Sequence, residues 1–183
     1  MKQVILVAVV MCVLSPFAMG YCRENSPALE FIYGNGHAFT VRTPEGWVSD
    51  SPSARAFDLL SFFCPAHASI KTETYLYAQA WDKTDRSQTI QDFIESDIDD
   101  FKGQQHSLSF TRKKSAIQPS YIASWHYTFS GIDGGYREDI VYVETEYSFA
   151  VLVYSSNSKK NYDRYLPVFD GFVRSFHFRD AQE

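Results

Sequence analysis

A histidine flanked by hydroxyl side chains is the arrangement in this sequence that comes closest to catalysis. His126 lies on an expected strand, and Ser124, Thr128 and Ser130 share its alternating register. A hydroxyl beside an imidazole is typical of a serine hydrolase, which also needs a carboxylate. The chain lacks the G-x-S-x-G turn that commonly exposes such a nucleophile. We therefore expect no catalytic residues, unless the fold brings His126 to an acid and a hydroxyl.

The densest run of charge is the acidic segment 95–100, which contains Glu95, Asp97, Asp99 and Asp100. Carboxylate oxygens suit calcium, but a calcium loop needs spaced ligands around a turn glycine, and this register lacks one. Three interpretations stay open: a solvated helix face, a surface for a basic partner, or a calcium site. Since the histidines also form no i,i+4 pair, we expect no metal and no cofactor.

Aromatic residues are abundant, with 15 Phe, 12 Tyr and 3 Trp in 183 residues. Tyr75, Tyr77 and Trp81 share one side of an expected strand, and Trp125 and Tyr127 share a side of another. Such rows are core material when helices cover them. A row left uncovered would be a large apolar patch and a candidate interface.

Residues 1–20 have the features of a cleaved signal peptide. A lysine precedes an apolar run at 4–14, and the small residues Ala18 and Gly20 stand at the -3 and -1 positions of a cut after Gly20. The run is shorter than the roughly 18–20 residues that a membrane-spanning helix needs. We expect a periplasmic or secreted protein without stable membrane insertion after cleavage. Lipid attachment at Cys22 stays open.

Two cysteines remain once this segment is removed, Cys22 and Cys64. In an oxidising compartment an even pair predicts one disulfide, which would contribute on the order of 3–4 kcal/mol to stability. The alternatives are a free thiol or a metal ligand, because Cys64 and His67 have C-x-x-H spacing. A single half-site without a second Cys/His pair is weak evidence for zinc.

The apolar periodicity predicts an α+β fold with a single antiparallel sheet and helices packed on a face. The strand at 70–81 is apolar on both sides and is expected inside the sheet. The last three strands have short connections and should pair antiparallel. Pro167 is placed in the first turns of the last helix. Strands are expected at 37–41, 59–63, 70–81, 108–112, 121–129, 136–144 and 147–154, and helices at 90–101 and 162–176.

The helix at 90–101 should begin after an N-cap at Ser87 or Thr89 and end at Gly103. Short turns are expected at 34–36, 43–47 and 118–120. No linker-like change of composition divides residues 21–183, which are therefore expected to form one domain.

Two motifs near the ends of this expected domain carry a family resemblance. Residues 39–47 fit the pattern F-x-V-x-x-P-x-G-W, and residues 175–178 fit S-F-x-F at the close of the last helix. Together with the central helix and the three-strand meander, these motifs resemble the PsbP/MOG1-like superfamily. The resemblance implies an α/β sandwich and relatives that bind other proteins without doing chemistry. These relatives include photosystem accessory subunits, nuclear-transport regulators, periplasmic lipoproteins and secretion-associated chaperones or immunity-type proteins.

We therefore expect a non-catalytic exported protein that binds another protein in an accessory, chaperone or immunity-like role. A net charge of -5 argues against nucleic acid, because such binders need a basic surface to displace counterions. The alternative is a module that binds a small ligand or carbohydrate with exposed aromatic side chains. A hydrolase ranks third.

Overall fold

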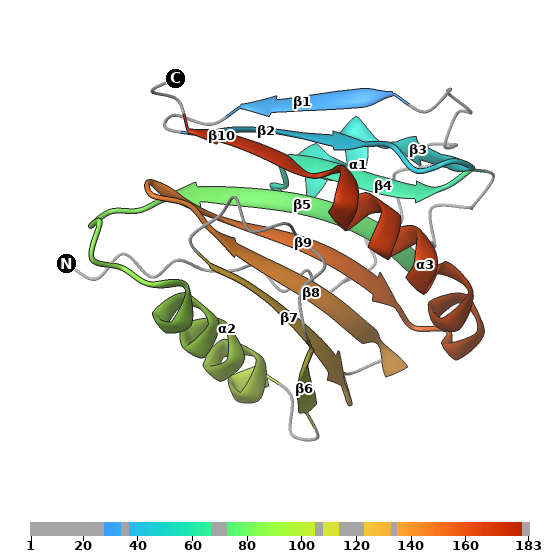
Figure 1. Ribbon diagram of the computed structural model, residues 1–183. Coiled ribbons are helices and arrows are strands. Elements are labelled where there is room, and N and C mark those ends of the chain that lie inside the picture. The colour runs from blue at the N-terminus through green and yellow to red at the C-terminus, as the bar shows by residue number, and fades with distance from the viewer. Residues whose placement is uncertain are drawn as a thin grey trace.

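The computed structural model describes residues 28–33, 37–66, 73–104, 108–113, 123–132 and 135–180. Along these residues, runs of strands are separated by single helices (Figure 1). The strands are β1 (Leu29–Tyr33), β2 (His37–Arg42), β3 (Trp47–Ser49), β4 (Ser61–Pro65), β5 (Thr74–Asp82), β6 (Ser109–Lys113), β7 (Ala123–Ser130), β8 (Arg137–Glu144), β9 (Ser148–Ser156) and β10 (His177–Asp180). The helices are α1 (Ser51–Ala56), α2 (Ile90–Gln104) and α3 (Lys159–Ser175).

The strands form two antiparallel sheets, so the prediction of a single sheet is wrong. The large sheet has the order β3-β4-β5-β9-β8-β7-β6, and the small one has the order β1-β2-β10. Two causes explain the difference. Strand β1 lies at 29–33, where no strand was expected, and α3 ends at Ser175, so that 177–180 becomes a strand beside β2. Strand β2 thus pairs with β1 and β10, away from the large sheet.

The helices cover both faces of the large sheet, which corrects the expectation of helices on a single face (Figure 1). Alternation along β5 shows the division. Leu76 and Ala78 pack in a core with α3 and the small sheet, whereas Trp81 packs with α2 and Tyr75 with the α1 region. Strand β5 lies between β4 and β9, which confirms its predicted interior position.

The predicted meander is confirmed, because β7, β8 and β9 are neighbours with antiparallel register. The turn before Trp47 is also formed as predicted. Trp47 N donates to Pro44 O at 3.0 Å, and Gly46 has φ +73, a conformation that a residue with a Cβ adopts at a cost. The turns expected at 34–36 and 118–120 lie outside the described residues.

Helix α2 begins where its capping residue predicts. Thr89 Oγ1 accepts from Asp92 N at 3.3 Å, and Thr89 N donates back to Asp92 Oδ2 at 3.3 Å. This reciprocal pair resembles a capping box and satisfies two N–H groups at the helix start. The helix continues through Gly103 to Gln104, so the predicted stop at Gly103 is one residue early.

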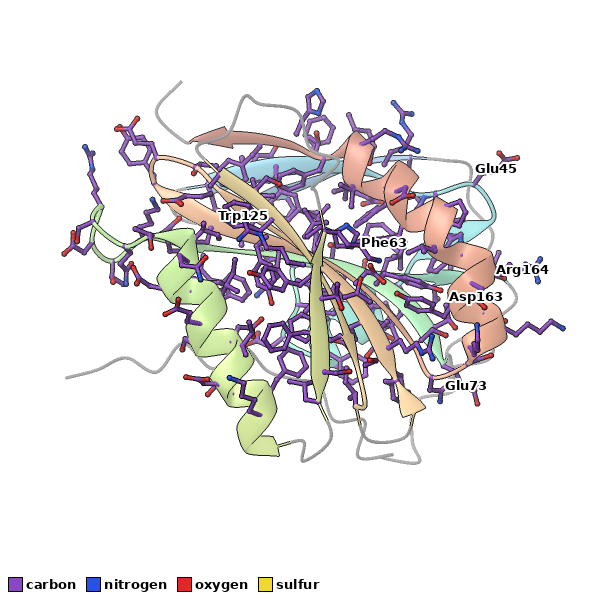
Figure 2. The ribbon with its side chains drawn as sticks, turned by 60° about the horizontal axis from the view of Figure 1, so that its bottom comes forward. Glu45, Phe63, Glu73, Trp125, Asp163 and Arg164 are labelled. Carbon is purple, nitrogen blue, oxygen red and sulfur yellow. The ribbon has the colours of Figure 1, made fainter. Side chains whose placement is uncertain are left out.

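Helix α3 contains Pro167 at its ninth position, not in the first turns as predicted. Proline there lacks an N–H donor, but the residue is exposed, and the apolar stripe on either side keeps the helix on the sheet. Tyr162, Phe169 and Phe172 form this buried stripe. In Figure 2, Asp163 and Arg164 point away from the same helix toward solvent, while Phe63 lies inside the molecule.

Candidate functional site

An apolar row on β1 is the most exposed group of large hydrophobic side chains in the described part of the chain. Leu29, Phe31 and Tyr33 are 44%, 60% and 69% exposed. They alternate along the strand and therefore share its outer face. Ile32 points inward and is 8% exposed. The row is thus a surface feature of a strand whose inner face is anchored in the core.

Strand β1 is also an edge. Within the described ranges it pairs with β2 alone, in a register that sets Leu29 opposite Arg42 and Phe31 opposite Thr40. Edge strands offer free backbone groups to another chain. Arg42 is the charged residue that the β1–β2 pairing places beside the row, and it is exposed.

The edge strand β6 of the large sheet differs from β1. Its five residues are all exposed and include Phe110, which is 43% exposed. Two cations follow on the same strand: Arg112 lies 3.2 Å from the Trp125 ring centroid, and Lys113 contacts a carboxylate. Charged side chains on an edge discourage strand addition. Strand β1 has no such protection on its outer face, so the two edges are not equivalent.

A buried carboxylate on the α3 side, Asp139, binds four donors and is 0% exposed. Asp139 Oδ1 lies 2.6 Å from His126 Nε2, 2.8 Å from Thr128 Oγ1 and 3.2 Å from Lys113 Nζ. The Tyr162 hydroxyl donates to Oδ2. Burial acts to raise the pKa of Asp139, but the hydrogen bonds and the Lys113 charge outweigh it and lower that pKa. This cluster joins β6, β7, β8 and α3.

The structure therefore brings His126 to an acid and a hydroxyl. Thr128 and His126 both point at the same carboxylate oxygen, and among the described contacts no hydrogen bond joins the Thr128 hydroxyl to the imidazole. A hydrolase needs the imidazole to face its nucleophile. The arrangement is that of a buried carboxylate with its hydrogen bonds satisfied. The expectation that the chain has no catalytic residues stays a prediction.

The α2 side holds two further buried acids, Asp97 and Glu138, which are 2% and 9% exposed. Asp97 Oδ2 accepts from the Tyr142 hydroxyl, while Oδ1 is buried without a hydrogen-bond partner. Burial raises the pKa of Asp97 to about 6, against the Tyr142 hydrogen bond, and the charge of Asp100 adds to the rise. Burial likewise raises the pKa of Glu138 to about 7; Ser155 opposes this rise, and the charge of Asp97 adds to it.

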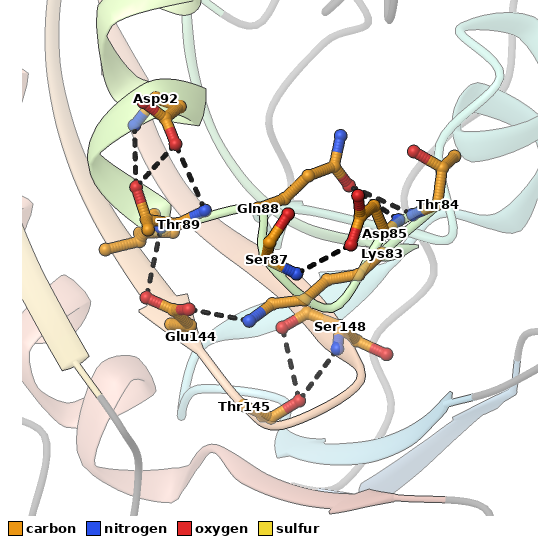
Figure 3. Close-up of polar contacts among 11 residues, drawn as sticks. Lys83, Thr84, Asp85, Ser87, Gln88, Thr89, Asp92, Glu144, Thr145 and Ser148 are labelled. Atoms are coloured by element: carbon orange, nitrogen blue, oxygen red, sulfur yellow. Dashed lines mark hydrogen bonds and ion pairs between the residues drawn. The ribbon is translucent and has the colours of Figure 1, made fainter.

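A third acid on this side, Glu144, is fully paired (Figure 3). Its Oε1 lies 2.6 Å from Lys83 Nζ, and its Oε2 accepts from Ile90 N at 3.0 Å. A carboxylate at the first N–H groups of a helix interacts favourably with the helix dipole. Glu144 therefore fixes the N-terminus of α2 to β8, whereas Asp97 lies near the middle of the helix.

The acidic segment 95–100 is only partly the solvated face that was one of its interpretations. Glu95 and Asp99 are exposed, but Asp97 faces the sheet. No group of three or more metal-binding side chains occurs in the described ranges, which also contain no helix long and apolar enough to cross a bilayer. The calcium interpretation therefore has no support from these residues.

Both predicted aromatic rows lie on the side of the sheet that α1 and α2 cover. Trp81 contacts Phe93 of α2 at 5.4 Å between ring centroids, and Tyr75 is 9% exposed. Tyr127 is also buried. Neither row is an open stacking platform, and the exposed row is instead the unpredicted one on β1. Its signal was available in the alternation of Leu29 with Phe31.

The predicted Cys22–Cys64 pairing lies partly outside the described residues. Cys64 is on β4 and is 1% exposed, whereas Cys22 precedes residue 28. The disulfide stays a prediction, as does the signal peptide at 1–20. His67, of the C-x-x-H spacing, also falls outside the described ranges.

Comparison with known proteins identifies the fold. No family model and no curated protein matches the chain. A solution structure of cyanobacterial PsbP (CyanoP) from Synechocystis sp. PCC 6803 matches it with a TM-score of 0.53 and 13% identity, covering 87% of this chain and 98% of that one. The chain therefore has a PsbP-like fold, as the motifs at 39–47 and 175–178 predict. At this identity the likeness concerns the fold alone.

Proposed function

We propose that this chain of PsbP-like fold is a non-catalytic exported protein that binds an extended apolar segment of another protein along β1. The main support for this proposal is the exposed row of Leu29, Phe31 and Tyr33 on an edge strand. Export through cleavage of residues 1–20, to the periplasm or the medium, and a Cys22–Cys64 disulfide are part of the proposal.

Strand addition is the binding mode that this edge favours. An incoming strand would gain main-chain hydrogen bonds from the free edge, while its alternate side chains would meet the apolar row. The small sheet that carries β1 is held to the core by buried Phe39 and Val41 of β2, so the edge is presented on a firm support. A preformed edge lowers the ordering cost of binding.

The positive charge of Arg42, beside the apolar row, indicates which residues a bound segment would carry. Arg42 is exposed opposite Leu29, and Glu30 faces the other way, where it accepts from Thr43 Oγ1 at 3.3 Å. A bound segment with apolar residues at every second position and an acidic residue near Arg42 would complement both features.

A photoreactive amino acid in place of Phe31 tests this proposal in the host cell. We expect an adduct with a second protein from position 31, and Tyr33→Arg should reduce its yield about tenfold by placing a charge on the edge. Phe110 on β6 is the matched control, because it is an exposed phenylalanine on a protected edge. The absence of an adduct at 31, or equal adducts at 31 and 110, would contradict binding along β1.

A further inference from the structure

We propose that α2 is a pH-dependent cover of the large sheet, which packs closely when Asp97 and Glu138 are protonated and loosens when they ionise. This inference concerns the face opposite α3 and does not depend on the proposed binding along β1. It rests on where these two carboxyl groups lie and on what surrounds them.

Asp97 occupies a core position of α2. Ile94, Ile98 and Phe101 are buried on the same stripe of the helix, at most 7% exposed, and Asp97 itself is 2% exposed. Its one described hydrogen bond comes from the Tyr142 hydroxyl, and its Oδ1 is left without a partner. A protonated carboxyl tolerates this site far better than a carboxylate, which needs several donors or a cation when it is buried.

Glu138 adds a second acid to the same face. It lies on β8 in register with Ser155 of β9, two alternations from Tyr142. The charge of Asp97 disfavours ionisation of Glu138. Both charges also disfavour ionisation of the Tyr77 hydroxyl of β5. Because the two carboxyl groups interact, the ionisation of one makes ionisation of the other harder.

Three cations of the described residues on or next to the elements of this face bind other groups. Lys83 binds Glu144, Lys102 binds the exposed Asp99, and Arg112 of β6 stacks on Trp125. No ion pair to Asp97 or Glu138 occurs among the described contacts. The groups that interact with the two acids are Asp100 of α2, Tyr77 of β5 and Tyr142 of β8, and β9 contributes Ser155. Tyr75 and Tyr127 adjoin these tyrosines on the same face. Arg137 of β8 lies over the Tyr162 ring of α3, and Asp92 and Glu95 of α2 and Arg55 of α1 are exposed.

The direction in which pH changes the docking of α2 follows from the raised pKa values of the two acids. The pKa of Asp97 is about 6 against an ordinary 3.8, and that of Glu138 is about 7 against 4.5. A docked α2 thus keeps protons that an undocked α2 releases, so docking is strongest near pH 4 and weakens as the pH rises to about 7. The change at Asp97 alone corresponds to about a hundredfold shift of the docking equilibrium, because each pKa unit is a factor of ten.

The consequence of loosening is an aromatic surface beneath the helix. Phe93 contacts Phe149 at 5.3 Å and Phe101 contacts Phe129 at 5.0 Å, measured between ring centroids. Departure of α2 would uncover Phe149 and Phe129. The N-terminus of the helix would stay tethered by Glu144, whose contacts with Lys83 and Ile90 need no proton uptake.

Hydrogen exchange of the full exported chain at pH 5 and pH 7.5 tests this inference, with rates corrected for the intrinsic effect of pH. We expect protection of α2 amides to fall at least tenfold at pH 7.5, while α3 amides keep theirs. Asp97→Asn and Glu138→Gln should each remove part of the fall, and the second variant keeps the inference testable if the first does not fold. Asp99→Asn is the control, because it changes an exposed charge on the same helix.

Equal protection of α2 at both pH values would overturn the inference. So would an equal response to Asp97→Asn and Asp99→Asn, because the effect would then be one of overall helix charge. A parallel loss of protection in α2 and α3 would also overturn it, by showing that the whole domain loosens.

Discussion

The two faces of the large sheet bury carboxylates in opposite ways. Asp139, on the α3 side, is 0% exposed and has four donors around it. Asp97, on the α2 side, is 2% exposed and has one described donor, the Tyr142 hydroxyl. Their pKa values move in opposite directions, lowered for Asp139 and raised for Asp97.

The contrast teaches that depth of burial does not decide whether an acid stabilises a fold. Both acids lose their water almost completely, but Asp139 receives three hydrogen bonds and a nearby cation in exchange, whereas Asp97 receives one described hydrogen bond. The free energy of a buried charge depends on the donors that replace water. Asp139 therefore links α3 to the sheet through Tyr162, while Asp97, on the buried side of α2, destabilises the packing of that helix when it is ionised.

Replacing Asp139 should have the largest effect on the free energy of unfolding. Asp139→Ala leaves His126, Thr128, Lys113 and Tyr162 without their common acceptor, and we expect the free energy of unfolding in urea to fall by about 3–5 kcal/mol at pH 7. The control is Asp163→Ala, which removes an exposed acid paired with Lys159 and should cost less than about 1 kcal/mol. Similar losses in both variants would mean that Asp139 is not a special contact.

Replacing Asp97 should raise the free energy of unfolding, by less than the loss of Asp139 lowers it. The raised pKa of Asp97 corresponds to roughly 3 kcal/mol of destabilisation at pH 8. Replacement by Asn regains only part of this free energy, because the new buried amide also lacks hydrogen-bond partners. We expect Asp97→Asn to raise the free energy of unfolding by about 1 kcal/mol at pH 8 and to leave it nearly unchanged at pH 4. A loss of stability at pH 8 would contradict this interpretation.

The sequence predicted most of the large sheet, because alternation along β5 and short turns between β7, β8 and β9 are local signals. It did not predict the second sheet. Leu29, Phe31 and Tyr33 alternate, but Ile32 between them is also apolar, and the stripe of α3 continues through Phe176 without a glycine or proline to mark its end. What separates helix from strand there is the pairing of 177–180 with β2, which is a tertiary contact.

The two acids could be found from the sequence to different degrees. Asp97 falls between Ile94 and Ile98 on a helical stripe, so its burial follows from spacing alone. Asp139 alternates with Val141, which indicates an inward direction, but its contact with His126 requires the register of β7 against β8. Donors from three elements, β6, β7 and α3, meet Asp139 of β8 there, and a single sequence does not contain that register.

A titration of the carboxyl carbons by NMR, in the folded chain, tests the contrast between the two faces most directly. Asp97 should titrate with a midpoint of about 6 and Glu138 of about 7, because their protonated forms are favoured by burial. Asp139 should titrate below 3.8, because its donors favour the charged form. Midpoints of Asp97 and Asp139 that both lie near 3.8, or in the reverse order, would contradict the account.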